Sequence, residues 1–190
     1  GKAIAYRTDL LQIVIPTTYA GSEVTPILGQ TEGGRKTTVR DAKILPEIVI
    51  YDPSLTLGLP VAMSVTSGLN AMAHAVEGLY AQDRNPISSL MALEGLRAFE
   101  RSLPVIVNDP KNTEARSDAL YGAWLCGSVL GTVGMALHHK ICHTLGGSFD
   151  TPHAETHAVM LPHTAAFNAT AAAPKLAEAA RMFGGSIGGG

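Results

Sequence analysis

The pattern of hydrophobic and polar residues changes near residue 58 of the chain. Before this point, two short runs rich in β-branched residues, at 12–15 and 47–51, are followed by Pro and Asp-Pro, as is typical of buried strands. Between them, residues 26–41 combine short mixed runs with three glycines, which predicts a β-hairpin with a glycine turn. We therefore expect the first third of the chain to have α/β character.

After Pro60 the apolar residues recur with the period of a helix. The segments that follow are rich in Ala, Leu and Met, and they predict helices at Val61–Tyr80, Ser88–Val107, Thr113–Val133, His138–Leu145, Ala154–Asn168 and Pro174–Phe183. Prolines and the pair Gly146-Gly147 separate these segments and indicate helix ends or kinks. The sequence thus predicts an α/β part at 1–58, an all-α bundle at 59–183 and a glycine-rich tail at 184–190.

Composition and charge narrow the class of protein. The chain has 14 Lys+Arg against 16 Asp+Glu and no basic run, so nothing favours a nucleic acid or an anionic membrane as a partner. Apolar residues make up 46% of the chain, which excludes disorder, and no uninterrupted apolar run is long enough to span a membrane. The two cysteines, Cys126 and Cys142, are too few for a disulfide framework, and we expect a cytoplasmic protein.

Histidine is the most unevenly distributed residue type, with six of the seven between residues 138 and 163. Residues four apart share one face of a helix, so His139 and His143 are expected to be neighbours. His153 follows beyond the Gly-Gly break, and His74 belongs to another predicted helix. If these imidazoles converge, they suit zinc or ferrous iron, or they suit acid–base catalysis.

A structural role for the histidines stays open, because the HxxxH spacing without an acidic residue is a weak signal. Taken singly, His138, His157 and His163 are better interpreted as hydrogen-bonded or solvated side chains. The loop Thr17–Thr25 is also ambiguous. Its hydroxyl groups and backbone N–H groups suit a phosphate or a ribose. It contains neither GxGxxG nor a Walker lysine, so taken alone it is better interpreted as a surface turn.

Six segments, in order, resemble the iron-containing alcohol dehydrogenase family. They are IPTT from Ile15, GSEVT from Gly21, YDPSLTLGLP from Tyr51, SGLNAMAHAVE from Ser67, HHKICHTLGG from His138 and PHAETHAVMLPH from Pro152. Within this family they are most similar to the maleylacetate reductase branch. The resemblance implies a Rossmann-like dinucleotide-binding domain followed by a helical bundle, as in dehydroquinate synthase-like architecture, with the active site in the cleft between them.

The resemblance also implies a nicotinamide cofactor, NADH or NADPH. The residues that would line its nicotinamide and ribose side are Thr17, Thr18, Ser22, Thr25 and Lys36. The family's glycine-rich pyrophosphate loop would precede Gly1, so we expect this chain to hold half of a cofactor site and to be inactive alone.

The metal ligands of the family correspond to Asn70, His74, His139 and His153, and the asparagine stands where the family has an aspartate. Because an amide oxygen is a neutral and weak ligand, a divalent iron or zinc ion is expected to bind poorly. The resemblance then implies that the imidazoles act with little or no metal.

By this resemblance, the expected activity is NAD(P)H-dependent reduction of maleylacetate, a small dicarboxylate, to 3-oxoadipate in aromatic catabolism. His143 is the expected proton donor or relay, and a homodimer is expected. Two alternatives remain: a metal-dependent alcohol or aldehyde dehydrogenase with the same fold, and a non-catalytic helical binding module whose histidines are structural.

Overall fold

The structure, a computed structural model, describes residues 1–32 and 35–184, and for residues 31, 32, 35 and 36 it describes the backbone alone. The predicted turn glycines Gly33 and Gly34 therefore lie outside the described residues, as does the part of the predicted tail at 185–190.

The N-terminal part combines one helix with two small sheets. Its elements are α1 (Lys2–Thr8), β1 (Ile13–Val14), β2 (Ile27–Glu32), β3 (Arg35–Arg40) and β4 (Ile48–Val49). β1 pairs in parallel with β4, whereas β2 and β3 form an antiparallel pair. The predicted strands and hairpin are confirmed, although β1 and β4 are shorter than expected, and α1 was not predicted.

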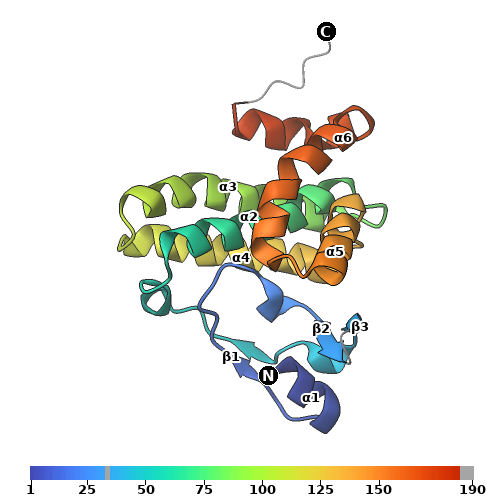
Figure 1. The fold of residues 1–190 in the computed structure, drawn as a ribbon. Coiled ribbons are helices and arrows are strands. Elements are labelled where there is room, and N and C mark those ends of the chain that lie inside the picture. The colour runs from blue at the N-terminus through green and yellow to red at the C-terminus, as the bar shows by residue number, and fades with distance from the viewer. Residues whose placement is uncertain (33–34, 185–190) are drawn as a thin grey trace.

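The rest of the described chain is helical and lies to one side of the N-terminal elements (Figure 1). The helices are α2 (Val61–Tyr80), α3 (Pro86–Asn108), α4 (Thr113–Thr132), α5 (Leu137–Phe149) and α6 (His153–Met182). The side chain of Asn85 caps α3 and that of Asn112 caps α4, each by accepting a hydrogen bond from a first-turn N–H. The helical part predicted from the period is confirmed.

Two predicted helix boundaries are wrong. α5 continues through Gly146-Gly147, and it ends beside Asp150, whose left-handed φ of 52° provides the C-terminal turn. The two helices predicted at 154–168 and 174–183 are the single helix α6, with Pro162 and Pro174 in its interior. A proline removes one backbone hydrogen bond and kinks a helix without necessarily ending it, and α6 changes direction along its length (Figure 1).

The hydrophobic core lies where α2, α3 and α4 pack together, with the later part of α6 against it. Fully buried side chains such as Phe99 of α3 and Leu120 of α4 fill it. Small residues on α2 allow close approach, because a Cβ atom on Gly78 would lie 2.2 Å from Val129 Cγ1. Since α2 is covered on several sides, five of its polar residues are buried as well: Ser64, Ser67, Asn70, His74 and Glu77.

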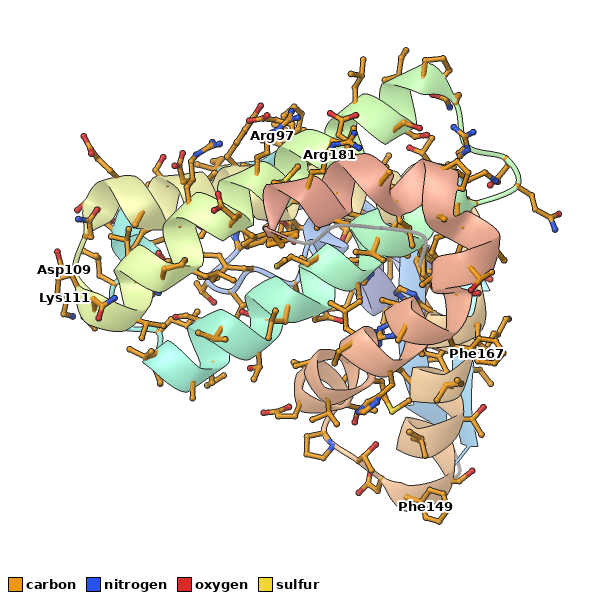
Figure 2. All side chains as sticks on the ribbon, turned by 90° about the horizontal axis from the view of Figure 1, so that it is seen from above. Arg97, Asp109, Lys111, Phe149, Phe167 and Arg181 are labelled. Carbon is orange, nitrogen blue, oxygen red and sulfur yellow. The ribbon has the colours of Figure 1, made fainter. Side chains whose placement is uncertain are left out.

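Charged side chains project from the outer faces of the bundle (Figure 2). Arg97 of α3 forms an ion pair of 2.9 Å with Glu178 of α6, which links these helices at the surface. On the side of the molecule opposite Asp109 and Lys111, Phe149 and Phe167 point outward, and their side chains are 72% and 77% exposed.

No single helix in the described parts of the chain is both long enough and apolar enough to cross a membrane. α4 and α5 together are long and apolar enough, but the chain bends by 94° between these two helices.

The loop that follows β1 is held against α4 by direct backbone contact. Gly21 has a left-handed φ of 76°, and a Cβ atom added to Gly127 of α4 would lie 2.2 Å from the Gly21 carbonyl oxygen. Arg116 of α4 is fully buried and donates hydrogen bonds to Tyr19 Oη at 2.9 Å and to Ser64 Oγ at 2.7 Å. These contacts fix the loop over the helical part.

We predict that Gly127→Ala destabilises the protein. The new methyl group collides with backbone atoms that cannot rotate away, so the free energy of unfolding should fall by about 1–3 kcal/mol, as overpacking costs. Gly147→Ala is the matched control, because nothing lies within 4 Å of its added Cβ. In a helix this second change should stabilise by about 0.5–1 kcal/mol. Urea unfolding measures both, and equal effects would contradict the close contact at Gly127.

Candidate functional site

A cavity of about 600 Å³ opens between the N-terminal elements and the helical part, a volume within the range of small-molecule sites. The loop after β1 contributes Ser22 and Thr25, and α2 contributes Asn70 and His74. The end of α4, α5 and the start of α6 complete the opposite wall.

The four predicted imidazoles come together at this cavity. Ring centroids lie 4.9 Å apart for His74 and His139, 6.1 Å for His139 and His143, and 6.3 Å for His143 and His153. His74 and His139 are buried, whereas His143 and His153 are exposed. The predicted convergence of these side chains, from three helices, is therefore confirmed.

A buried carboxylate, that of Glu77 on α2, organises the imidazoles. The backbone N–H of His138 donates to Glu77 Oε1 at 2.8 Å, and that of Ala136 donates to Oε2 at 3.1 Å. These N–H groups belong to the start of α5, which has no side-chain cap of its own, so Glu77 performs that function. Burial alone would raise the pKa of Glu77, but the hydrogen bonds from His139 and the backbone lower it, and Glu77 is ionised at neutral pH.

Glu77 also sets the tautomer of His139. Its Oε2 forms a short hydrogen bond with His139 Nδ1, and because a carboxylate only accepts, the hydrogen is on Nδ1. The other nitrogen, Nε2, then accepts a hydrogen bond of 2.7 Å from His74 Nδ1. Burial, together with the nearby imidazoles, lowers the pKa of His74, so this ring is neutral near pH 7.

A second group of histidines lies behind the cavity wall. The rings of His138 and His157 are 4.8 Å apart, and that of His157 is 4.5 Å from the ring of His153. Burial lowers the pKa of His138 to about 4 and raises that of Cys142 to about 11. His138 and His157 are buried and hydrogen-bonded to one another, in keeping with the structural role that the sequence favoured for each.

The predicted cofactor residues are divided by the structure. Ser22 and Thr25 line the cavity, and the Thr25 hydroxyl donates to the Ser22 carbonyl at 2.9 Å, so it stabilises the loop itself. Thr17 is exposed and Thr18 is half-buried, and neither is among the described residues that line the cavity. Lys36 lies in β3, and its side chain is outside the described part of the chain.

The charge at the cavity is positive. Arg40 of β3 and Lys140 of α5 line it, while no Asp or Glu is among its described lining residues. Asn70 Oδ1 is buried and has no hydrogen-bond partner among the described residues. The donors that face this cavity are thus four imidazoles and a neutral amide. A divalent cation held by these side chains alone would keep its full charge, so they suit it less well than a set that includes a carboxylate.

Sequence reasoning missed Glu77, Arg40 and Lys140. A signal for the first was present, because Asn70, His74 and Glu77 are spaced four and then three residues apart, which places them on one face of a helix. The two cations carry no local signal, since only the packing of the hairpin against the helices brings β3 and α5 to the same cavity.

Comparison with known proteins agrees with this geometry. Residues 64–189 match the C-terminal part of the Fe-containing alcohol dehydrogenase family. The maleylacetate reductase of Rhizobium sp. (strain MTP-10005) is 69% identical over 188 residues, which are 99% of this chain and 54% of that protein. Its crystal structure superposes with a TM-score of 0.95 over 98% of this chain and 53% of that one.

Two further crystal structures are similar. The maleylacetate reductase from Agrobacterium tumefaciens is 70% identical, with a TM-score of 0.95 over 98% of this chain and 53% of that one. A sulfoacetaldehyde reductase from Bifidobacterium kashiwanohense, in complex with NAD+, is 26% identical, with a TM-score of 0.78 over 84% of this chain and 43% of that one. The chain thus spans about half the length of the relatives that it matches, and it belongs to the iron-containing alcohol dehydrogenase family.

Proposed function

We propose that the complete protein containing this chain reduces maleylacetate to 3-oxoadipate with NADH or NADPH. The observation that carries this proposal is a cavity lined by imidazoles and two cations, with no acidic residue among its described lining. Such a lining favours an anionic substrate, and maleylacetate carries two carboxylates. The high sequence identity of this chain with maleylacetate reductases supports the same assignment.

The two cations bind the substrate in this proposal. Arg40 and Lys140 lie at the cavity on opposite walls, one on the hairpin and one on α5. A dianion between them gains from both charges, and a guanidinium also matches the geometry of a carboxylate. A neutral alcohol or aldehyde gains nothing from this arrangement, which favours the reductase over an alcohol dehydrogenase.

The chemistry is a hydride transfer to a conjugated ketone. Hydride leaves C4 of the reduced nicotinamide and bonds to the substrate carbon β to the ketone, while the C=C electrons move to form an enolate. A proton then bonds to the α carbon, which gives 3-oxoadipate and the oxidised cofactor. We assign this proton to His143, with His74, His139 and His153 as the surrounding shell of imidazoles.

We further propose that residues 1–58 are the C-terminal part of a dinucleotide-binding domain. The parallel pairing of β1 with β4 is typical of such α/β domains, and Ile13 and Ile48 in these strands are 65% and 51% exposed, which suits a sheet that continues. A structural relative crystallised with NAD+ supports the choice of cofactor. The free cysteines fit a cytoplasmic location, and the homodimer stays a prediction.

The first test measures consumption of NADH and NADPH by the complete protein, with maleylacetate beside simple aldehydes. We expect turnover of maleylacetate that survives a chelator, and His143→Gln should lower kcat by roughly 10²- to 10⁴-fold, the usual contribution of a general acid. His163→Gln is the matched control, because His163 is exposed and lies away from the cavity lining. Undiminished turnover by His143→Gln would contradict its role and favour a binding module.

A second test restores the carboxylate at position 70. Asn70→Asp should increase the affinity of this cavity for Fe²⁺ or Zn²⁺ by roughly 10-fold or more, because ligand charge sets the affinity of such sites. Isothermal titration of the metal-stripped protein measures it. The same variant should lose affinity for maleylacetate, since the added charge repels a dianion. Unchanged uptake of both metals would show that residue 70 does not belong to a metal-binding position.

A third test separates the positioning role of Glu77 from its structural role. Glu77→Gln leaves buried N–H groups without an acceptor, so the free energy of unfolding should fall by about 1–3 kcal/mol. Because His139 loses its fixed tautomer, kcat should fall while KM changes little. Glu94→Gln, a surface change on α3, should alter stability by no more than about 0.5 kcal/mol. Full kcat in a destabilised Glu77→Gln protein would restrict Glu77 to stability.

A further inference from the structure

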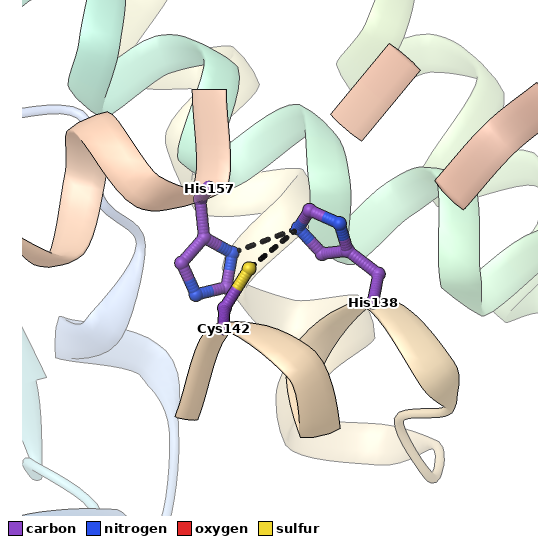
Figure 3. A group of neighbouring side chains, drawn as sticks. All are labelled: His138, Cys142 and His157. Atoms are coloured by element: carbon purple, nitrogen blue, oxygen red, sulfur yellow. Dashed lines mark hydrogen bonds between the residues drawn. The ribbon is translucent and has the colours of Figure 1, made fainter. Parts of the chain in front are cut away.

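A cluster of three potential metal ligands lies outside the cavity, between α5 and α6 (Figure 3). His138 and Cys142 are one turn apart on α5, and His157 faces them from α6. His138 Nε2 lies 2.9 Å from His157 Nδ1 and 3.7 Å from Cys142 Sγ. One atom from each side chain can be chosen so that all three lie within 4.8 Å of one another, and all three residues are buried.

The tautomer of His138 is suited to coordination. The Thr164 hydroxyl donates to the Met160 carbonyl at 3.0 Å, so its oxygen accepts the hydrogen bond from His138 Nδ1 at 2.9 Å. The hydrogen of His138 is therefore on Nδ1, and the lone pair of Nε2 faces the cluster. Histidines that bind metals commonly have their other ring nitrogen fixed by such a hydrogen bond.

The two distances from His138 Nε2 to the other ligand atoms are close to those between ligands of one ion. Zinc binds imidazole nitrogen at about 2.0–2.1 Å and thiolate sulfur at about 2.3 Å, so tetrahedral ligand atoms lie about 3.3–3.6 Å apart. The distances of 2.9 and 3.7 Å differ from these values by a few tenths of an ångström. A small rotation of the His157 ring would therefore admit an ion.

The composition of the cluster selects the kind of ion. Cys142 offers a thiolate, an anionic ligand of the kind that the cavity does not have among its described residues. Two imidazoles and one thiolate suit zinc and similar borderline-soft ions better than magnesium, calcium or manganese. His157 Nε2 is buried without a partner among the described residues, so no hydrogen bond prevents it from carrying the ring hydrogen when Nδ1 binds an ion.

We propose that His138, Cys142 and His157 form a binding site for one zinc-class ion that fastens α5 to α6. On binding, the Cys142 thiol releases its proton to solvent, and the hydrogen of His157 moves from Nδ1 to Nε2. One sulfur–metal bond and two nitrogen–metal bonds then form, with no change of oxidation state. Because the His157 ring lies 4.9 Å from that of His139 and 4.5 Å from that of His153, the ion holds the wall of the cavity from behind. This site is distinct from the four residues that correspond to the family's ligands.

The test uses the complete protein, stripped of metal and titrated with Co²⁺, because cobalt bound to a thiolate has a charge-transfer absorption that nitrogen and oxygen ligands do not produce. We expect this absorption to saturate at one ion per chain and to disappear when Zn²⁺ is added. Cys142→Ser should abolish it, whereas Cys126→Ala, at the other free cysteine, should retain it. His153→Ala should also retain it, since His153 belongs to the cavity.

Thr164→Val provides a graded test, because it removes the hydrogen bond that orients His138 while preserving shape. It should weaken cobalt binding by roughly 10- to 100-fold. The proposal is overturned if the charge-transfer absorption is absent, or if it survives in Cys142→Ser. Should that variant not fold, alkylation of the unsubstituted protein decides: protection of Cys142 by Zn²⁺ supports the site, and equal labelling with and without Zn²⁺ rejects it.

Discussion

The positions of the imidazoles at the start of α5 depend on one buried carboxylate. Glu77 is fully buried, and a charge in that location is stable only because several N–H groups donate to it. Those donors come from the first turn of α5 and from the His139 ring. Glu77 of α2 is therefore hydrogen-bonded to the first turn of α5, where His138 and His139 lie. These hydrogen bonds fix the directions in which the two side chains point.

The same junction explains why the two groups of imidazoles differ in chemistry. His138 and His139 are adjacent in sequence and point to different sides, one to the buried cluster and one to the cavity. The described side chains that line the cavity are neutral or cationic, which suits an anion. On the buried side the partner is a thiol, which suits a soft cation. Two adjacent residues thus serve two environments, although their ring centroids are only 5.4 Å apart.

Much of this arrangement could be predicted from the sequence. The helical period predicts α2, α3 and α4, and the clustering of the histidines indicates that four of them meet. Local signals failed where tertiary packing overrides them: Gly146-Gly147 does not end α5, and Pro174 does not divide α6.

The cations of the cavity could not be predicted, because Arg40 and Lys140 are far apart in sequence and meet only through packing. The same limit applies to Thr17 and Thr18. Their hydroxyl groups suit a ligand, but neither residue is among the described residues that line the cavity.

The contact between Gly21 and Gly127 has a mechanical consequence. Two backbones that touch without intervening side chains have no freedom to slide, so the loop beside the cavity and the bundle behave as one rigid body. Any widening of the cavity for ligand exchange then falls to the hairpin, which is held to the end of α4 through Arg40 and the carbonyl of Gly131. Because Arg40 is also one of the two cations at the cavity, an incoming dianion would draw on the same guanidinium that keeps the hairpin in place.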